Sequence, residues 1–182
     1  MFEIKTVLRD RDYRFGTKPG LFSKDQIDYG TRLLIENMVI DSTDTVLDLG
    51  CGYGPIGIVA AGLAKQGRVF LVDSDIRAIK YSRINAGLND AENVEAKVSD
   101  GFDELKGVKF DVAVSNLSRL PKEVITEFIE GAKKQLNPGG KLYLVTEETT
   151  KSMVSKELLR VFENCEEVVS RKGYTVSLAV NK

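Results

Sequence analysis

Apolar and polar residues follow two periods along the chain, one typical of strands and one typical of helices. Residues 45–49 and 68–72 are short apolar, β-branched runs, as in strands that are buried on both faces. Residues 55–65 lie between them and place apolar side chains at helical spacing. The same reasoning predicts strands at 2–8, 93–98, 110–115 and 141–146, and helices at 75–88, 121–136 and 152–162.

The two ends of the chain carry separate signals. A polar turn is expected after the first strand, and Ser23 with Gln26 forms a capping-box pattern ahead of a helix that runs to about Met38. The last 17 residues predict a hairpin of 166–171 and 174–180.

Turn and loop signals separate several of these segments. Residues 137–140 (Asn-Pro-Gly-Gly) predict a turn, and Glu147-Glu148 is interpreted as a loop. Because strands and helices alternate, we expect an α/β fold with a doubly wound, Rossmann-like parallel sheet to which the hairpin adds an antiparallel edge. We predict one domain over 1–182, with a strand-and-helix extension at 1–40 and the Rossmann-like core at 41–182.

Composition narrows the possible chemistry. The 182 residues include 26 basic and 27 acidic side chains, so we do not expect the protein to bind nucleic acid through a net positive charge. Histidine is absent, which excludes histidine-based triads and histidine-liganded zinc. The two cysteines, Cys51 and Cys165, are too few for a disulfide framework or a four-thiolate site. No signal or spanning segment is evident, so we expect a cytoplasmic protein without membrane or metal.

A glycine-rich turn after the strand at 45–49 is the strongest functional signal. It reads Val46-Leu47-Asp48-Leu49-Gly50-Cys51-Gly52-Tyr53-Gly54-Pro55-Ile56-Gly57. In open α/β sheets ligands bind beyond the carboxyl ends of the strands, where glycines let the backbone approach closely. The alternative is a tight connection without a ligand, but four glycines in eight residues favour a ligand site.

The turn fits two ligand classes. Gly52, Gly54 and Gly57 satisfy the dinucleotide pattern G-x-G-x-x-G, and Asp73 follows at the end of the next strand, as that pattern requires. A carboxylate at Asp48 would repel a pyrophosphate but attract the cationic sulfur and amine of S-adenosylmethionine. Asp73 would accept from ribose hydroxyls in either case.

A third acidic position follows the strand at 93–98. Asp100 could accept from an adenine amine, with Phe102 or Ile76 against the ring, although Asp100 alone is equally explained as a helix cap or turn residue. Acidic residues thus occur at the ends of three successive strands, and the first of them precedes the glycine turn. This arrangement favours S-adenosylmethionine over a dinucleotide.

The glycine turn resembles motif I of class I S-adenosylmethionine-dependent methyltransferases. Residues 15–23, followed by Ile27-Asp28 and Gly30-Thr31, resemble the segment before motif I in the small-subunit ribosomal RNA guanine-N2 methyltransferase family and its small archaeal relatives. The resemblance implies a seven-stranded sheet with its last strand antiparallel, and Phe22 and Ser23 near the donor. We expect S-adenosylmethionine to be bound by Asp48, Gly50, Cys51, Gly52, Gly54, Asp73, Ser74, Asp100, Gly101, Phe102 and Asn116.

One motif departs from that family. Its members carry Asn-Pro-Pro after the fourth core strand, where the asparagine oxygen and the first proline's carbonyl accept from the target amine. Here the stretch is Asn116-Leu117-Ser118, so both prolines are absent. We predict Asn116 and the Leu117 carbonyl as the catalytic groups, and Phe22, Ser23 and Arg119 as substrate contacts. Cys51 has no histidine to activate it as a nucleophile.

Three functions remain open at this point. The leading hypothesis is methylation of an exocyclic amine of a nucleic-acid base, guanine N2 in small-subunit ribosomal RNA. The others are a methyltransferase for a small molecule or protein, and a donor-binding module impaired by the altered motif. The expected partner is ribosomal RNA or the small ribosomal subunit, approached by Lys18, Lys24, Arg119 and Lys122, which ordinary surface charge explains equally well. Both a monomer and a homodimer are compatible with the sequence.

Overall fold

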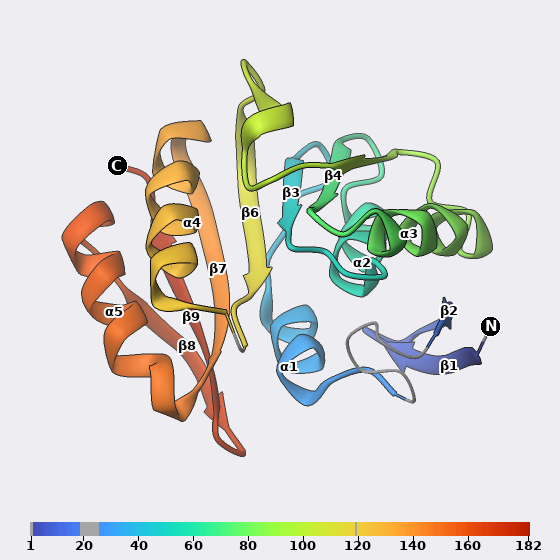
Figure 1. Cartoon of the computed structure of the whole chain (residues 1–182), viewed down its shortest axis with the longest axis horizontal. Coiled ribbons are helices and arrows are strands. Elements are labelled where there is room, and N and C mark those ends of the chain that lie inside the picture. The colour runs from blue at the N-terminus through green and yellow to red at the C-terminus, as the bar shows by residue number, and fades with distance from the viewer. Residues whose placement is uncertain (1, 19–25, 119) are drawn as a thin grey trace.

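The computed structural model describes residues 2–18, 26–118 and 120–182, and it contains a seven-stranded sheet and a separate two-stranded hairpin (Figure 1). The strands are β1 (Phe2–Leu8), β2 (Arg11–Thr17), β3 (Thr45–Leu49), β4 (Arg68–Asp73), β5 (Val94–Val98), β6 (Phe110–Asn116), β7 (Leu136–Glu147), β8 (Glu166–Arg171) and β9 (Tyr174–Val180). The helices are α1 (Tyr29–Asn37), α2 (Pro55–Leu63), α3 (Ile76–Leu88), α4 (Lys122–Gln135) and α5 (Glu148–Phe162), with a 3-10 turn at Asp103–Leu105.

The order of strands in the large sheet is β5-β4-β3-β6-β7-β9-β8. The neighbours from β5 to β7 pair in parallel, and β9 pairs antiparallel with both β7 and β8. The predicted α/β fold with an antiparallel last strand is confirmed. The chain moves outward from β3 to β5 and then returns to the other side of β3 at β6. Such a reversal is where open sheets of this kind place their ligands.

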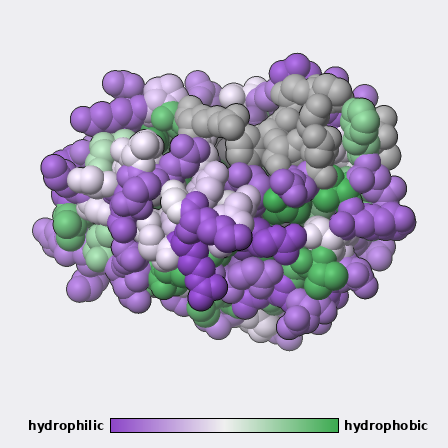
Figure 2. Space-filling view, turned by 90° about the horizontal axis from the view of Figure 1, so that it is seen from below, coloured by the Kyte–Doolittle hydropathy of each residue, from purple (hydrophilic) through white to green (hydrophobic). Residues whose placement is uncertain are grey.

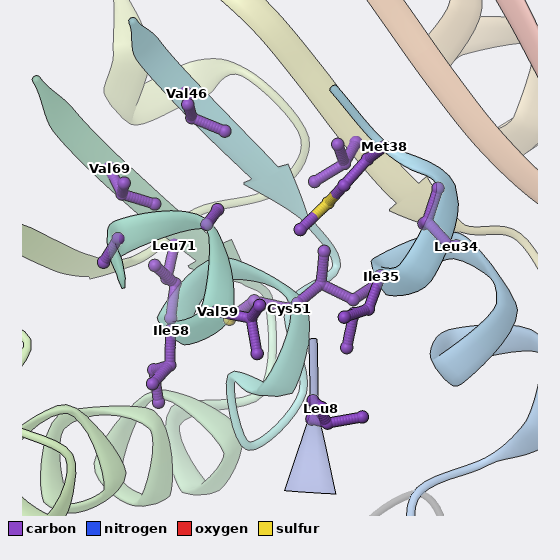
Figure 3. Close-up of a cluster of buried hydrophobic side chains, with 14 of the residues drawn as sticks. Leu8, Leu34, Ile35, Met38, Val46, Cys51, Ile58, Val59, Val69 and Leu71 are labelled. Atoms are coloured by element: carbon purple, nitrogen blue, oxygen red, sulfur yellow. The ribbon is translucent and has the colours of Figure 1, made fainter. Parts of the chain in front are cut away.

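Helices cover both faces of the sheet (Figure 1). Neighbouring residues in a strand point to opposite faces, so Val46 belongs to a core cluster under α1, α2 and α3, whereas Leu47 belongs to one under α4 and α5. Figure 3 shows part of the first cluster, which includes Val46 of β3, Ile35 of α1, and Ile58 and Val59 of α2. None of the helices in the described ranges has the length and apolarity needed to cross a membrane.

The N-terminal segment differs from the prediction of a strand and a polar turn. A second strand, β2, follows the first through a tight turn in which Arg9 and Asp10 have φ of 49° and 60°. Tyr13 and Phe15 alternate inward on β2, while Arg11, Asp12 and Arg14 are exposed. The exposed charged positions mask the strand pattern in the sequence.

Helix α1 begins later than the capping-box pattern indicates. Asp28 caps it, because the Asp28 Oδ2 atom accepts a hydrogen bond of 3.0 Å from the Thr31 backbone N–H. Gln26 lies in a bend ahead of the helix, and Ser23 falls outside the described residues. The cap is therefore the aspartate of the Ile27-Asp28 pair.

Two predicted connections are also corrected. Residues 137–140 continue β7 instead of forming a free turn, since Gly139 N–H donates to the Asn181 carbonyl and Asn181 N–H donates to the Gly140 carbonyl. Glu147 ends β7 and Glu148 opens α5, so no loop separates these elements. The hairpin at 166–180 matches its predicted strands residue for residue.

The carboxyl ends of the central strands face downward in Figure 1, and Figure 2 looks onto that side of the molecule. Where grey atoms do not cover it, this side is mainly hydrophilic, with hydrophobic residues in small separate groups. The visible part of the site-bearing face therefore carries no extended apolar patch.

Candidate functional site

A cavity of about 400 Å³ lies at the carboxyl ends of β3 to β6. Its described lining residues are Thr31, Gly50, Cys51, Gly52, Tyr53, Pro55, Ile56, Val72, Asp73, Ser74, Ser99, Asp100, Gly101, Asn116, Ser118, Leu120, Val124 and Phe128. A larger groove of about 720 Å³ is formed by β2 and the ends of α2 and α3, but basic and acidic side chains alternate along it. The strand-end cavity gathers eight of the predicted donor-binding residues, so we regard it as the functional site.

The glycine turn forms the floor of this cavity. Gly54 stands directly before α2 with a φ of 94°, and a Cβ there would lie 3.0 Å from the Leu71 side chain. Gly52 has a φ of 57°, and its N–H donates to Asp73 Oδ2 at 2.9 Å. Both positions need the left-handed backbone that glycine adopts readily. Gly54 supports the turn without lining the cavity.

Asp48 does not face the cavity, contrary to expectation. Its side chain points beneath the glycine turn, where Oδ2 accepts a hydrogen bond of 2.8 Å from the Gly57 N–H. The residue is 1% exposed, and Oδ1 is buried without a hydrogen-bond partner. Burial, with a smaller contribution from the charge of Asp73, raises the pKa of this carboxyl to about 7. Asp48 therefore stabilises the glycine turn and does not contact a ligand in the cavity directly.

Asp73, the last residue of β4, lines the cavity together with Ser74. Its two carboxylate oxygens accept from the Gly52 and Asp75 N–H groups at 2.9 and 2.8 Å. These bonds fix the carboxylate and leave further lone pairs for a ligand. Asp73 is therefore the acid whose position best suits recognition of ribose hydroxyls.

The end of β5 supplies a second acid and an aromatic wall. Asp100 and Gly101 line the cavity as expected, but Phe102 does not. Phe128 of α4 takes that place, and Phe102 packs edge-on behind it with ring centroids 6.5 Å apart. Ile76, the other predicted ring contact, is 70% exposed and is not among the lining residues.

Asn116 closes the cavity at the end of β6. Its amide nitrogen donates to Asp28 Oδ2 at 3.0 Å and to Thr31 Oγ1 at 2.9 Å. Its Oδ1 accepts from the Ser118 N–H at 3.0 Å. An amide oxygen has two lone pairs, so one acceptor position on Asn116 remains for a substrate.

Leu117, predicted as the second catalytic residue, is not placed at the cavity. It is 1% exposed, its side chain joins the core under α4 and α5, and its carbonyl accepts from the Leu120 N–H at 3.2 Å. Ser118 lines the cavity instead, and its hydroxyl oxygen is buried without a partner. A buried hydroxyl of this kind is a candidate hydrogen-bonding group for a ligand.

Several site residues could not be recognised from local patterns. Thr31 and Phe128 occupy helices in which they follow the core spacing, and Tyr53 lies in the glycine turn at a position that the glycine pattern leaves unspecified. The predicted substrate contacts Phe22, Ser23 and Arg119 lie outside the described residues. Cys51 lines the cavity, and burial raises its pKa well above the usual range, which opposes the nucleophilic thiolate.

The chemistry of the lining residues fits a cationic adenosyl donor. The charged side chains among the described lining residues are Asp73 and Asp100, both acidic, with no lysine or arginine beside them. This field favours a sulfonium and an ammonium over a pyrophosphate. Within the described ranges, no group of three or more acidic or cysteine side chains is placed to hold a metal ion.

The sheet order and the strand-end cavity define a Rossmann-like fold with its ligand site at the carboxyl ends of the central strands. The chain matches the methyltransferase small domain family over residues 12–177, and it belongs to that family. It is an S-adenosylmethionine-dependent methyltransferase.

Three known proteins illustrate this relationship. An uncharacterised protein, YbxB, of Bacillus subtilis is 32% identical over 93% of this chain and 86% of its own length. The ribosomal RNA small subunit methyltransferase C of Salmonella choleraesuis is 34% identical over 71% of this chain, but over only 39% of that longer protein. A Thermus thermophilus 16S rRNA N2 methyltransferase, solved with AdoMet and guanosine, superposes on the whole chain with a TM-score of 0.88 and 23% identity. This chain spans half of that structure.

Proposed function

We propose that the enzyme methylates the exocyclic N2 amine of guanine in small-subunit ribosomal RNA. The observation that carries the proposal is the Asn116 amide at the edge of the donor cavity, with one acceptor position on Oδ1 unused. The similarity to a small-subunit rRNA methyltransferase, and to a fold solved with guanosine, supports the choice of base. The proposal places the protein in the cytoplasm with the ribosomal subunits.

The chain's own groups divide the work between holding the donor and orienting the acceptor. Bound S-adenosylmethionine supplies a methyl group on a positively charged sulfur, which is a good leaving group. Asp73, Ser74, Asp100 and Gly101 hold the donor, and Phe128 with Ile56 gives the cavity apolar walls. Orientation and exclusion of water are the main contributions required of the protein.

Asn116 orients the target amine. The lone pair of a guanine amine is delocalised into the ring, so the nitrogen is a weak nucleophile. An N–H bond to Asn116 Oδ1 favours the geometry in which that lone pair is available for transfer, and the proton leaves to water afterwards. No histidine is needed for this step. A base in structured RNA must first be unstacked, which costs a few kcal/mol.

The altered motif changes how Asn116 is used. With serine at 118 in place of proline, a backbone N–H is present, and it occupies one lone pair of Asn116 Oδ1. Leu117 is not among the residues that line the cavity, so the Ser118 hydroxyl, which is buried there without a partner, becomes the second polar group beside Asn116. We infer that Ser118 takes over part of the recognition of the base.

Label transfer tests the proposal. The enzyme is incubated with methyl-labelled donor and unmodified small ribosomal subunits, and the RNA is digested to nucleosides. We expect label in N2-methylguanosine, and we expect Asn116→Ala to lower the rate by about a hundredfold because the acceptor is lost. The affinity of Asn116→Ala for S-adenosylhomocysteine should stay within about twofold of the wild type, since the charged side chains that line the cavity, Asp73 and Asp100, remain in place.

Glu157→Gln serves as the control, because Glu157 lies on α5 in an ion pair with Arg160 and does not line the cavity. Label found only in small molecules or protein would reject ribosomal RNA as the substrate. Tight donor binding with no transfer to any fraction would identify a donor-binding module. Unchanged turnover in Asn116→Ala would remove Asn116 from the reaction.

A further inference from the structure

The amide nitrogen of Asn116 is held from a part of the chain far away in sequence. Asp28 and Thr31, its two acceptors, lie at the N-terminal end of α1, 88 and 85 residues before it. Each amide hydrogen therefore has its own acceptor. With both hydrogens bonded, rotation of the amide plane is blocked and Oδ1 keeps one direction.

The two acceptors are themselves fixed. Asp28 Oδ2 also accepts from the Thr31 N–H at 3.0 Å, so the carboxylate is part of the helix cap. Thr31 is 4% exposed. Between them, Gly30 leaves room for the Tyr174 ring of β9, since a Cβ at Gly30 would lie 2.7 Å from Tyr174 Cδ1. The first turn of α1 is thus seated closely against the sheet that carries Asn116.

The Asn116 amide is restrained at both of its polar atoms, since the Ser118 N–H bonds Oδ1 while Asp28 and Thr31 accept from the nitrogen. Leu117 and Ser118 lack the fixed φ of proline, so the backbone after Asn116 is less restrained. A carboxylate that accepts from the amide nitrogen also polarises the amide, which makes its oxygen a better acceptor. An acceptor that aligns a weak nucleophile must be held close to its productive geometry.

We propose that Asp28 and Thr31 are positioning residues for methyl transfer, an inference that rests on the proposed function. They fix the direction of Asn116 Oδ1 and thereby couple the start of α1 to the reacting amine. The clamp, defined as Asp28, Thr31 and Asn116, acts on turnover and not on donor binding.

Thr31→Val removes the hydroxyl acceptor while keeping the side-chain shape and the backbone N–H. We expect this variant to lower kcat on small ribosomal subunits about tenfold, the effect of one lost positioning hydrogen bond, and to leave KM and donor affinity nearly unchanged. Thr31→Ser restores the hydroxyl and should recover kcat to within about threefold of the wild type. Glu157→Gln again serves as the remote control.

Asp28→Ser tests the second acceptor. Serine is a good helix cap, but its shorter side chain cannot serve both the Thr31 N–H and Asn116. Turnover should fall while the thermal transition changes little. If this variant fails to fold, the Thr31 pair still decides the question.

A direct readout of the clamp does not depend on the substrate. In amide NMR spectra, the Asn116 side-chain protons should exchange slowly with solvent in the wild type and in Thr31→Ser, and measurably faster in Thr31→Val. An unchanged kcat in Thr31→Val, or an equal loss in Thr31→Ser, would overturn the proposal. If the wild type methylates no RNA, the proposed function fails, and the exchange rates alone decide the clamp: equal rates in wild type and Thr31→Val overturn it.

Discussion

The carboxyl of Asp48 is buried under the glycine turn with one oxygen unpartnered. Burial raises its pKa from 3.8 to about 7, because a charge there would be desolvated and would lie near Asp73. The folded chain therefore binds a proton at Asp48 that the unfolded chain has released above pH 4. Stability from this group is complete below the unfolded pKa and is lost as the pH rises through the folded value.

We predict that the free energy of unfolding decreases between pH 5 and 8 and that Asp48→Asn flattens this dependence. The amide can still accept from the Gly57 N–H and carries no charge. Because histidine is absent, few other groups titrate in this window. Urea unfolding of both proteins at pH 5 and pH 8 measures the effect. An equal decrease in wild type and variant would show that Asp48 is ionised throughout.

The sequence identified Asp48 as important but misjudged its direction. Side chains in a strand alternate between faces, and Asp48 shares the face of Val46 under α2, one residue before the strand ends. Asp73 is the last residue of its strand and lies at the cavity, as predicted. Whether such an aspartate lines the cavity depends on whether it is the last residue of its strand or the one before it. The motif alone does not specify where the strand ends.

At the scale of elements, two asparagines near the end of helix α3 bond to the N-terminal hairpin, and one of them, Asn85, also bonds to the glycine turn. Asn85 accepts from the Gly16 N–H and donates to the carbonyls of Gly16 and Tyr53. Asn89 makes the equivalent pair of bonds to the Arg14 backbone, nearer the surface. The two side chains satisfy the free edge of β2 in place of a third strand.

We expect Asn85→Ala to destabilise the protein by about 3 kcal/mol, because buried backbone groups lose their partners, and to weaken donor binding through the Tyr53 carbonyl. Asn89→Ala is the matched control, with a loss of about 1 kcal/mol because water replaces its more exposed bonds. Urea unfolding gives the stabilities, and titration with S-adenosylhomocysteine gives the affinity. Equal losses for both variants would contradict the role given to Asn85.

Element prediction succeeded where the hydrophobic pattern was strong. The strands of the sheet, including the hairpin at 166–180, were predicted from their apolar runs. Strand β2 was missed because its exposed face is charged, and the start of α1 was misplaced because Ser23 and Asp28 both offer capping side chains. Choosing between two caps requires the packing of Gly30 against β9, which no local pattern reports.

At the scale of the whole molecule, the site combines two kinds of residue. Those at the strand ends could be predicted from the order of elements in the sequence, whereas those on helices reach the cavity only through tertiary packing. The residues at the ends of β4, β5 and β6 meet because parallel strands end at one edge of the sheet. Thr31 from α1 and Phe128 from α4 reach the same cavity from opposite faces of the sheet. The ligand class could thus be inferred from sequence, but the clamp on Asn116 could not.

The most direct test of the account is the ligand preference of the strand-end cavity, measured by isothermal titration calorimetry with S-adenosylmethionine and with NADH. Carboxylates are the charged groups among its described lining residues, so we predict that S-adenosylmethionine binds and that NADH does not. Asp73→Asn should weaken donor binding about tenfold, through loss of a charged hydrogen-bond acceptor. Firm binding of NADH together with no heat from S-adenosylmethionine would contradict the account.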